Sequence, residues 1–305
     1  MNMPTTLRIG TRKSPLAMRQ AEICQQALRT VVPTGTQVTI HAFQTSGDAY
    51  LAGNLSTIGN KGLFTKEIER ALLDGQIDIA VHSMKDVATQ PPDGLIIPTV
   101  LKRDDVRDML LTHHGTQIDD LPHGAVVGTS SLRRAVQLCR MRPDLKIIDY
   151  RGNIGRRMAR LEEGAIDATL LAAAGLQRME QQPDYAHMLE TNIILPAAAQ
   201  GAIGLQCRIN DEAIVALLTH LNHPATYCAI EAERHLLARL DGSCRTPIAA
   251  LATIHGETLT LEGMLAATDA TWLHRHRTHG PLAERIAVAD SLADILQKKA
   301  ALHDA

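Results

Sequence analysis

The sequence predicts an α/β protein with a smaller α+β segment at its C-terminal end. Between residues 7 and 172, strand-like apolar runs alternate with amphipathic helical segments, which is the pattern of α/β units. From about residue 223 the pattern changes to a helix (224–240) followed by two strand-like runs, 248–254 and 258–265. A chain of 305 residues is also too long for one ordinary core, so we expect two or three domains.

The first α/β segment begins with a strand at 7–10. Ser14 then provides an N-cap, and Pro15 occupies the first helical position. Apolar residues follow at helical spacing: Ala17, Ala21, Cys24, Leu28 and Val31. A strand at 38–43, a glycine-rich loop at 45–62, a helix at 65–74 and a strand at 77–82 are expected next.

The alternation then continues with a second series of elements. Strands are predicted at 95–100, 108–112, 125–128, 146–150 and 167–172, and helices at 131–142 and 154–163. Strands that alternate with helices form mainly parallel sheets, and ligands of such sheets bind at the carboxyl ends of the strands.

Composition narrows the class of protein. Hydrophobic residues make up 45% and charged residues 21%, which is typical of a soluble globular chain. The N-terminus has no signal-peptide pattern, and no apolar run approaches the roughly 20 residues that span a bilayer, so we expect a cytoplasmic protein without a membrane partner. The five cysteines form no Cys-x-x-Cys pair, which argues against a disulfide framework or a zinc site.

The histidines near the C-terminus do not suggest a metal site. His274, His276 and His279 are interleaved with Arg275 and Arg277. We therefore expect a solvated segment there and assign no metal ligand.

One stretch of the chain is strongly basic. Residues 133–160 contain nine Lys or Arg and two Asp, which predicts an anionic ligand. Nucleic acid is the rival interpretation. Aromatic residues, which stack on single-stranded bases, are only 2% of the chain, so a small anion is favoured.

The segment Gly128–Arg134 is the clearest anion-binding candidate. Hydroxyl residues fill the predicted helix start, where free N–H groups and the helix dipole favour an anion, and Arg133 and Arg134 lie in the first turn. The alternative is an ordinary capped helix with solvated arginines. Cations at a helix N-terminus are unfavourable without an anionic partner, which favours the anion site. Arg151–Arg157 repeats the pattern at the next strand–helix junction, at the same expected sheet edge.

Two segments of the first α/β series have related features. Thr11–Leu16 offers a similar strand-to-helix anion site, and Val81–Asp86 ends a strand with Ser83, Lys85 and Asp86. Lys85 and Asp86 could form a surface ion pair of little energetic value. Alternatively, the carboxylate could stabilise a cation or move a proton while the lysine binds substrate acid groups. The residues leave both interpretations open.

Cys244 lies in a tight loop, Leu240–Pro247, beside Arg245. A loop cysteine next to an arginine is more prone to form a thiolate than a buried one, although the default role of a lone cysteine is structural.

Six motifs together resemble the porphobilinogen deaminase (hydroxymethylbilane synthase) family. They occur in the family's order and cover nearly the whole chain: Thr11–Ala17, Gly59–Phe64, Val81–Asp86, Gly128–Arg134, Arg151–Gly155 and Asp241–Pro247.

The resemblance implies a transferase of tetrapyrrole (heme) biosynthesis. Members condense four porphobilinogen molecules head to tail, with loss of ammonia, to hydroxymethylbilane on a covalently bound dipyrromethane cofactor. It also implies a cytoplasmic monomer that needs no metal and has porphobilinogen as its partner. A non-enzymatic, two-lobed binder of small anions is the alternative. Such a binder leaves the Gly-Ser-Cys loop without a role.

The resemblance also implies roles for individual residues. Asp86 matches the catalytic aspartate, and Cys244 matches the cysteine that carries dipyrromethane through a thioether. The positions that match the cofactor-binding set are Ser83, Lys85, Thr129, Ser130, Ser131, Arg133, Arg134, Arg151 and Gly152. Those implicated in substrate binding are Arg12, Ser14, Arg157, Arg178 and Gln200, and Lys61 and Phe64 match the active-site loop.

By the same resemblance, three domains are expected. They are two periplasmic-binding-protein-like α/β domains and a smaller C-terminal α+β domain, comprising residues 1–101 with 202–219, 106–196, and 223–305. Hinges are expected near 102–105 and 197–201. The chain departs from the common family pattern at Thr57, at Ala199 (often glycine) and at Gln206 (often glutamate).

Overall fold

The computed structural model describes residues 4–46, 65–240 and 246–303. The chain divides into two compact units, Met1–Asp104 with Gly201–Tyr227, and Asp105–Gln200 with Cys228–Ala305. The chain therefore leaves the first unit after Asp104 and re-enters it at Gly201. No helix among the described residues is both long enough and apolar enough to cross a membrane.

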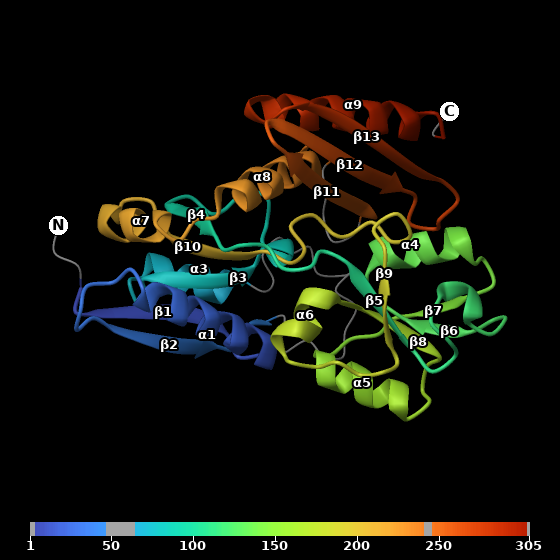
Figure 1. Ribbon diagram of the computed structural model, residues 1–305, viewed down its shortest axis with the longest axis horizontal. Helices are drawn as coiled ribbons and strands as arrows, with labels where there is room; N and C mark the ends of the chain where they lie inside the picture. The colour runs from blue at the N-terminus through green and yellow to red at the C-terminus, as the bar shows by residue number, and fades with distance from the viewer. Residues whose placement is uncertain (1–3, 47–64, 241–245, 304–305) are drawn as a thin grey trace. The chain divides into compact units, whose positions relative to one another are not determined.

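The first unit is built on a five-stranded sheet in the order β2-β1-β3-β10-β4 (Figure 1). The parallel strands are β1 (Thr6–Arg12), β2 (Gln37–Phe43) and β3 (Ile79–Ser83). Strand β10 (Ile203–Arg208) runs antiparallel between β3 and β4 (Leu95–Val100). The sheet is thus completed by a strand that follows β4 by about a hundred residues in the sequence.

Helices cover both faces of this sheet. Helix α1 (Pro15–Arg29) begins where the Ser14 side chain accepts the Ala17 N–H. It packs with α7 (Glu212–Thr219) against Leu7, Ile9, Ile79, Val81, Ile203 and Leu205. Helix α3 (Lys66–Leu73) packs on the opposite face, in a cluster with Ile77, Ala80 and Leu95. Cover on both faces explains why consecutive residues of the central strand β3, from Ile79 to His82, are all buried.

The second unit contains another five-stranded sheet, in the order β7-β6-β8-β5-β9. Strand β6 (Val126–Gly128) is parallel to both β7 (Lys146–Ile148) and β8 (Ala168–Ala172). Strand β5 (Asp108–Thr112) is antiparallel to β8 and to β9 (Ala186–Leu189). The helices that follow the parallel strands are α4 (Leu132–Met141), α5 (Ile154–Glu162) and α6 (Ala173–Arg178).

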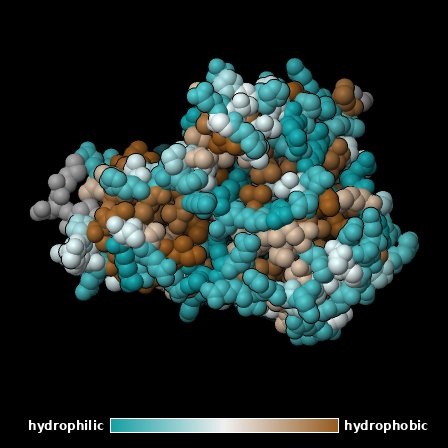
Figure 2. Space-filling model, viewed as in Figure 1, coloured by the Kyte–Doolittle hydropathy of each residue, from teal (hydrophilic) through white to brown (hydrophobic). Residues whose placement is uncertain are grey.

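A smaller sheet-and-helix domain forms the C-terminal part of this unit. Its strands are β11 (Ile248–His255), β12 (Thr258–Ala266) and β13 (Leu273–Pro281), joined as an antiparallel meander. Helices α8 (Pro224–Arg239) and α9 (Arg285–Ala301) meet at one face, because a Cβ added to Gly263 would contact Leu236 and Leu292. The opposite face packs Met264 against Val136 of α4. The side of α9 seen at the top of Figure 2 is largely hydrophilic, as expected for an amphipathic helix.

The segment around His274–His279, expected to be solvated, forms strand β13, whose residues are all half-buried or exposed. The strand pairs with β12 from Thr258↔Pro281 to Ala266↔Leu273. Arg275 and Arg277 both bind Glu262 on β12, at 2.5 and 2.8 Å. Cross-strand ion pairs therefore account for the interleaved charges of this strand.

Candidate functional site

Two strand ends of the first unit bring predicted site residues to one sheet edge. Strands β1 and β3 are parallel neighbours, with Ile9 opposite Ile79, so the residues that follow them lie at the same edge. Arg12 ends β1, and Ser83 ends β3. The amide of Gln20 on α1 donates to Ser83 Oγ at 2.7 Å, which ties the two strand–helix junctions together.

Asp86 is presented by a short 3-10 turn, Met84–Asp86, directly after β3. Met84 anchors this turn: its N–H donates to Ala202 O at 3.0 Å, and its thioether fills the space that a side chain at Gly204 would take. Asp86 is exposed, and its carboxylate has no hydrogen-bond or ion-pair partner among the described residues. Within the described ranges, the turn therefore exposes an unpaired carboxylate at the strand end.

In the second unit, the two predicted anion sites share one edge, as expected. Gly128 on β6 lies opposite Ile148 on β7, and Thr129 N–H donates to Ile148 O at 2.9 Å. Tyr150 N–H donates to Ser130 Oγ at 3.0 Å. A Cβ on Gly128 would lie only 2.6 Å from the Tyr150 ring, so this close approach requires glycine.

The three hydroxyl groups at the start of α4 all act as acceptors of backbone N–H groups. Thr129 Oγ1 accepts from Ser131, Ser130 Oγ from Tyr150, and Ser131 Oγ from Arg134. A hydroxyl that accepts in this way still has its O–H hydrogen to donate. None of the three has an acceptor for that hydrogen within the part of the chain that the structure describes, so the group as a whole suits an anion.

Arg133 and Arg134 are buried, with 6% and 7% of their surfaces exposed. Arg134 grips Asp108 through Nη2–Oδ1 at 2.7 Å and Nε–Oδ2 at 3.2 Å, and Arg133 Nη2 binds Asp108 Oδ2 at 2.9 Å. The interpretation of solvated arginines is therefore wrong. The anionic partner that the helix N-terminus requires is present, and it is an internal carboxylate.

Sequence reasoning missed Asp108. The residue is the first of β5, completely buried, in a strand that is otherwise mostly apolar. A charged residue in such a strand is a signal of a buried partner, because an unpaired buried carboxylate is very costly.

Arg157 on α5 is a half-buried cation whose pairing is incomplete among the described residues. Its Nε is buried and has no hydrogen-bond partner among the described residues. Burial lowers the pKa of Arg157 to about 10, and the neighbouring charge of Arg134 acts in the same direction. Of the other predicted cations, Arg151 pairs with exposed Asp149 at 3.2 Å, and Arg178 is buried at the end of α6, after β8. An anion bound at Arg157 would relieve this burial cost.

Several predicted residues lie outside the described part of the chain: Lys61, Phe64, Thr57 and Cys244.

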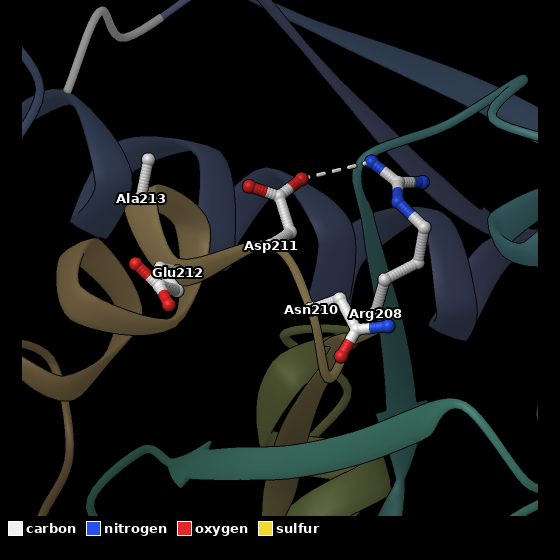
Figure 3. A pocket seen from close by; sticks show the side chains of 5 residues that line it. All are labelled: Arg208, Asn210, Asp211, Glu212 and Ala213. Atoms are coloured by element: carbon white, nitrogen blue, oxygen red, sulfur yellow. Dashed lines mark hydrogen bonds and ion pairs between the residues drawn. The ribbon is translucent and has the colours of Figure 1, made fainter.

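A cavity of about 420 Å³ lies away from the predicted site residues, at the start of α7 (Figure 3). It is lined by Arg208, Asn210, Asp211, Glu212 and Ala213, none of which is a predicted site residue. Arg208 is already bound there to Asp211 at 3.0 Å. Within the described ranges, no three His, Cys, Asp or Glu side chains group as metal ligands.

Comparison with known proteins decides the family. Residues 7–216 match the family model described as porphobilinogen deaminase, dipyromethane cofactor binding domain, and residues 227–298 match the porphobilinogen deaminase C-terminal domain. The chain belongs to the porphobilinogen deaminase family. The resemblance seen in the sequence is thereby confirmed, and so is the dipyrromethane cofactor that it implied.

Curated relatives agree with this assignment. The chain is 46% identical to the porphobilinogen deaminase of Syntrophotalea carbinolica, over 97% of this chain and 94% of that one. It is 45% identical to the porphobilinogen deaminase of Trichlorobacter lovleyi, over 96% and 93% of the two chains. A solved ancestral cationic amino acid solute-binding protein is 14% identical, with a TM-score of 0.45 over 71% of this chain and 88% of that one.

Proposed function

We propose that this chain is a porphobilinogen deaminase that condenses four porphobilinogen molecules, with loss of ammonia, to hydroxymethylbilane on a dipyrromethane bound to Cys244. The main structural support is the donor set of the second unit. Half-buried Arg157, whose buried Nε has no partner among the described residues, lies in the matched cofactor-binding domain with the hydroxyls of Thr129, Ser130 and Ser131. Such donors suit a ligand with several carboxylates.

The residues present fit the dipyrromethane group. Each of its pyrrole rings carries acetate and propionate side chains. Buried Arg133 and Arg134, together with half-buried Arg157, outnumber the Asp108 carboxylate that pairs with the first two. The residues assigned to hold it are Ser83, Lys85, Thr129, Ser130, Ser131, Arg133, Arg134, Arg151 and Gly152. When bound, the group supplies a tethered pyrrole with a free α-carbon to be extended.

Asp86 is assigned as the catalytic residue. Its carboxylate is exposed and has no partner in the described chain, so it can accept hydrogen bonds from pyrrole N–H groups. In that position it would stabilise the positive charge that develops as ammonia leaves the substrate, and it would then accept the proton lost from the α-carbon. Arg12, Ser14, Arg157 and Arg178 are assigned to the carboxylates of porphobilinogen and of the growing chain, and Gln200 is assigned to the same substrate-binding set.

The resemblance supports the remaining assignments. The enzyme acts as a cytoplasmic monomer, with porphobilinogen as its partner, without a metal, a nucleic acid or a membrane.

Intact-mass measurement tests the proposal. The wild-type chain should be heavier than its sequence by one dipyrromethane, and Cys244→Ser should lose this mass together with turnover. Cys139→Ser provides a matched control, because Cys139 is a half-buried thiol on α4 outside the assigned site. A folded wild-type chain of unmodified mass that does not consume porphobilinogen would instead favour the non-enzymatic anion binder.

A further inference from the structure

The Asp108 carboxylate has a donor at every lone-pair position that a carboxylate offers. Oδ1 accepts from Arg134 Nη2 at 2.7 Å and from Gln200 Nε2 at 2.9 Å. Oδ2 accepts from Arg133 Nη2 at 2.9 Å and from Arg134 Nε at 3.2 Å. Because a carboxylate has about four such positions, these contacts fix its orientation completely. The Gln200 amide is fixed in turn, since it also donates to Val106 O at 2.7 Å.

These hydrogen bonds determine which N–H groups of each guanidinium remain free to bind a ligand. The Nε and Nη2 groups on one edge of the Arg134 guanidinium both donate to Asp108, and Nη1 donates to Leu170 O at 2.9 Å. A carboxylate of a bound ligand therefore cannot bind the Nε–Nη2 edge and must approach the remaining N–H hydrogens of Nη1 and Nη2. Arg133 is oriented in the same way, because Nη1 donates to Leu195 O at 2.8 Å.

The arrangement also leaves positive charge in excess. One completely buried carboxylate serves two buried guanidinium groups, and the charge of Arg134 also acts on Arg157. If Asp108 were absent, buried Arg133 and Arg134 and half-buried Arg157 would repel one another. If a second carboxylate were present, little charge would be left for a ligand.

Resting on the proposed function, we propose that Asp108, held by Gln200, is a positioning residue that sets the charge and direction of Arg133 and Arg134. Asp108 neutralises part of their positive charge. The remaining positive charge is neutralised by the acid side chain of a bound pyrrole. Asp108 does not need to contact the ligand for this role.

A pair of substitutions at Gln200 separates charge from structure. Gln200→Glu places a second carboxylate beside Asp108 Oδ1, where the Gln200 amide now donates, and so cancels part of the charge that the two arginines leave in excess. Gln200→Met removes the amide hydrogen bonds without adding charge. Both changes occur at one fully buried position, so Gln200→Met is the matched control. We expect the dipyrromethane-loaded fraction, from intact mass, to be about tenfold lower in Gln200→Glu than in Gln200→Met at similar thermal midpoints.

The pH dependence of KM for porphobilinogen gives a second readout that a purely structural role would not change. In Gln200→Glu, KM should fall as the pH is lowered, because protonating the new carboxyl restores the surplus charge. In Gln200→Met, KM should not follow this pattern. Asp108→Glu should retain more loading than Asp108→Asn, because it keeps the carboxylate.

Equal loading of the two Gln200 variants, or losses that only follow their thermal midpoints, would overturn the inference while the proposed function stands. An unloaded, inactive wild-type chain would instead overturn the proposed function itself.

Discussion

The backbone N–H of Ala199 donates to Glu233 Oε2 at 2.6 Å while Ala199 holds a left-handed backbone with φ of 59°. Glu233 is completely buried, and its Oε1 accepts the Ala252 N–H of β11 at 2.8 Å. The carboxylate therefore joins the segment just before Gly201 to the C-terminal sheet. Left-handed backbone costs an L-residue about 1–2 kcal/mol, so Glu233 stabilises a strained position.

Ala199→Gly should stabilise the protein. Glycine adopts positive φ without the steric cost of a Cβ, although it gains entropy in the unfolded chain, so the net gain should be about 0.5–1 kcal/mol. Thermal unfolding measures it. Ala198→Gly is the control, since Ala198 is not among the residues with positive φ and should lose stability instead. A lower midpoint for Ala199→Gly would show that the strain is not released there.

Asp78→Asn should destabilise the first unit and change its acid response. Asp78 is 9% exposed and accepts Arg8 Nη2 at 2.8 Å and Arg8 N at 2.9 Å. Burial raises its pKa, but the hydrogen bonds from Arg8 outweigh this effect and leave the pKa below its usual 3.8. The stabilisation is thus complete above pH 3.8 and is lost as the pH falls through the lower folded pKa.

Denaturant unfolding at pH 7 should show a loss of about 2 kcal/mol for Asp78→Asn, and the difference from wild type should shrink below pH 3.8. Asp74→Asn is the control. Its pair with Arg70 is exposed at the end of α3, and such pairs contribute only about 0–1 kcal/mol. If the difference in unfolding free energy between wild type and Asp78→Asn stayed constant down to the acid transition, the stabilising role of the ionised Asp78 would be contradicted.

Asp86→Asn should reduce turnover at least about a hundredfold, because the amide can neither carry the compensating charge nor accept the proton. Thermal stability should change by less than about 0.5 kcal/mol, since the carboxylate is exposed and unpaired among the described residues. Asp93→Asn, an exposed aspartate of the same unit, should retain normal turnover. Near-normal rates in Asp86→Asn would remove this residue from the central role.

Gly128→Ala should destabilise the second unit by about 1–3 kcal/mol, because the new methyl group would overlap the fully buried Tyr150 ring. Gly155→Ala is the contrasting change. Gly155 lies in α5, and the nearest side-chain atom to an added Cβ would be Asn153 Oδ1 at 3.8 Å. The substitution should therefore gain about 0.5–1 kcal/mol of helix stability. Equal thermal midpoints for the two variants would mean that the strand end can move away from Tyr150.

Local patterns predicted much of the fold because the signals were short-range. The expected strand at 108–112 is observed with the same bounds, and the expected helix at 154–163 is observed as Ile154–Glu162. The strand β10 was not predicted. Its place between β3 and β4 depends on pairing with residues more than a hundred positions earlier, which no local pattern reports.

The candidate site, like the fold, could be predicted from the sequence only in part. Hydroxyls and arginines at strand–helix junctions were evident from the sequence, and parallel pairing of β6 and β7 explains why they share an edge. The ion pair of Arg134 with Asp108 was not evident, because Asp108 precedes Arg134 by 26 residues and the two meet only in the folded sheet. The roles of Asp86 and the other site residues remain predictions.

The inserted position of β10 has a consequence for biosynthesis. On a ribosome, β1, β2, β3 and β4 emerge long before Ile203–Arg208, so the N-terminal sheet lacks its fourth strand while the whole Asp105–Gln200 segment is being translated. During that interval the facing edges of β3 and β4 have unsatisfied backbone groups. The nascent chain is therefore vulnerable to misassociation until Arg208 leaves the exit tunnel.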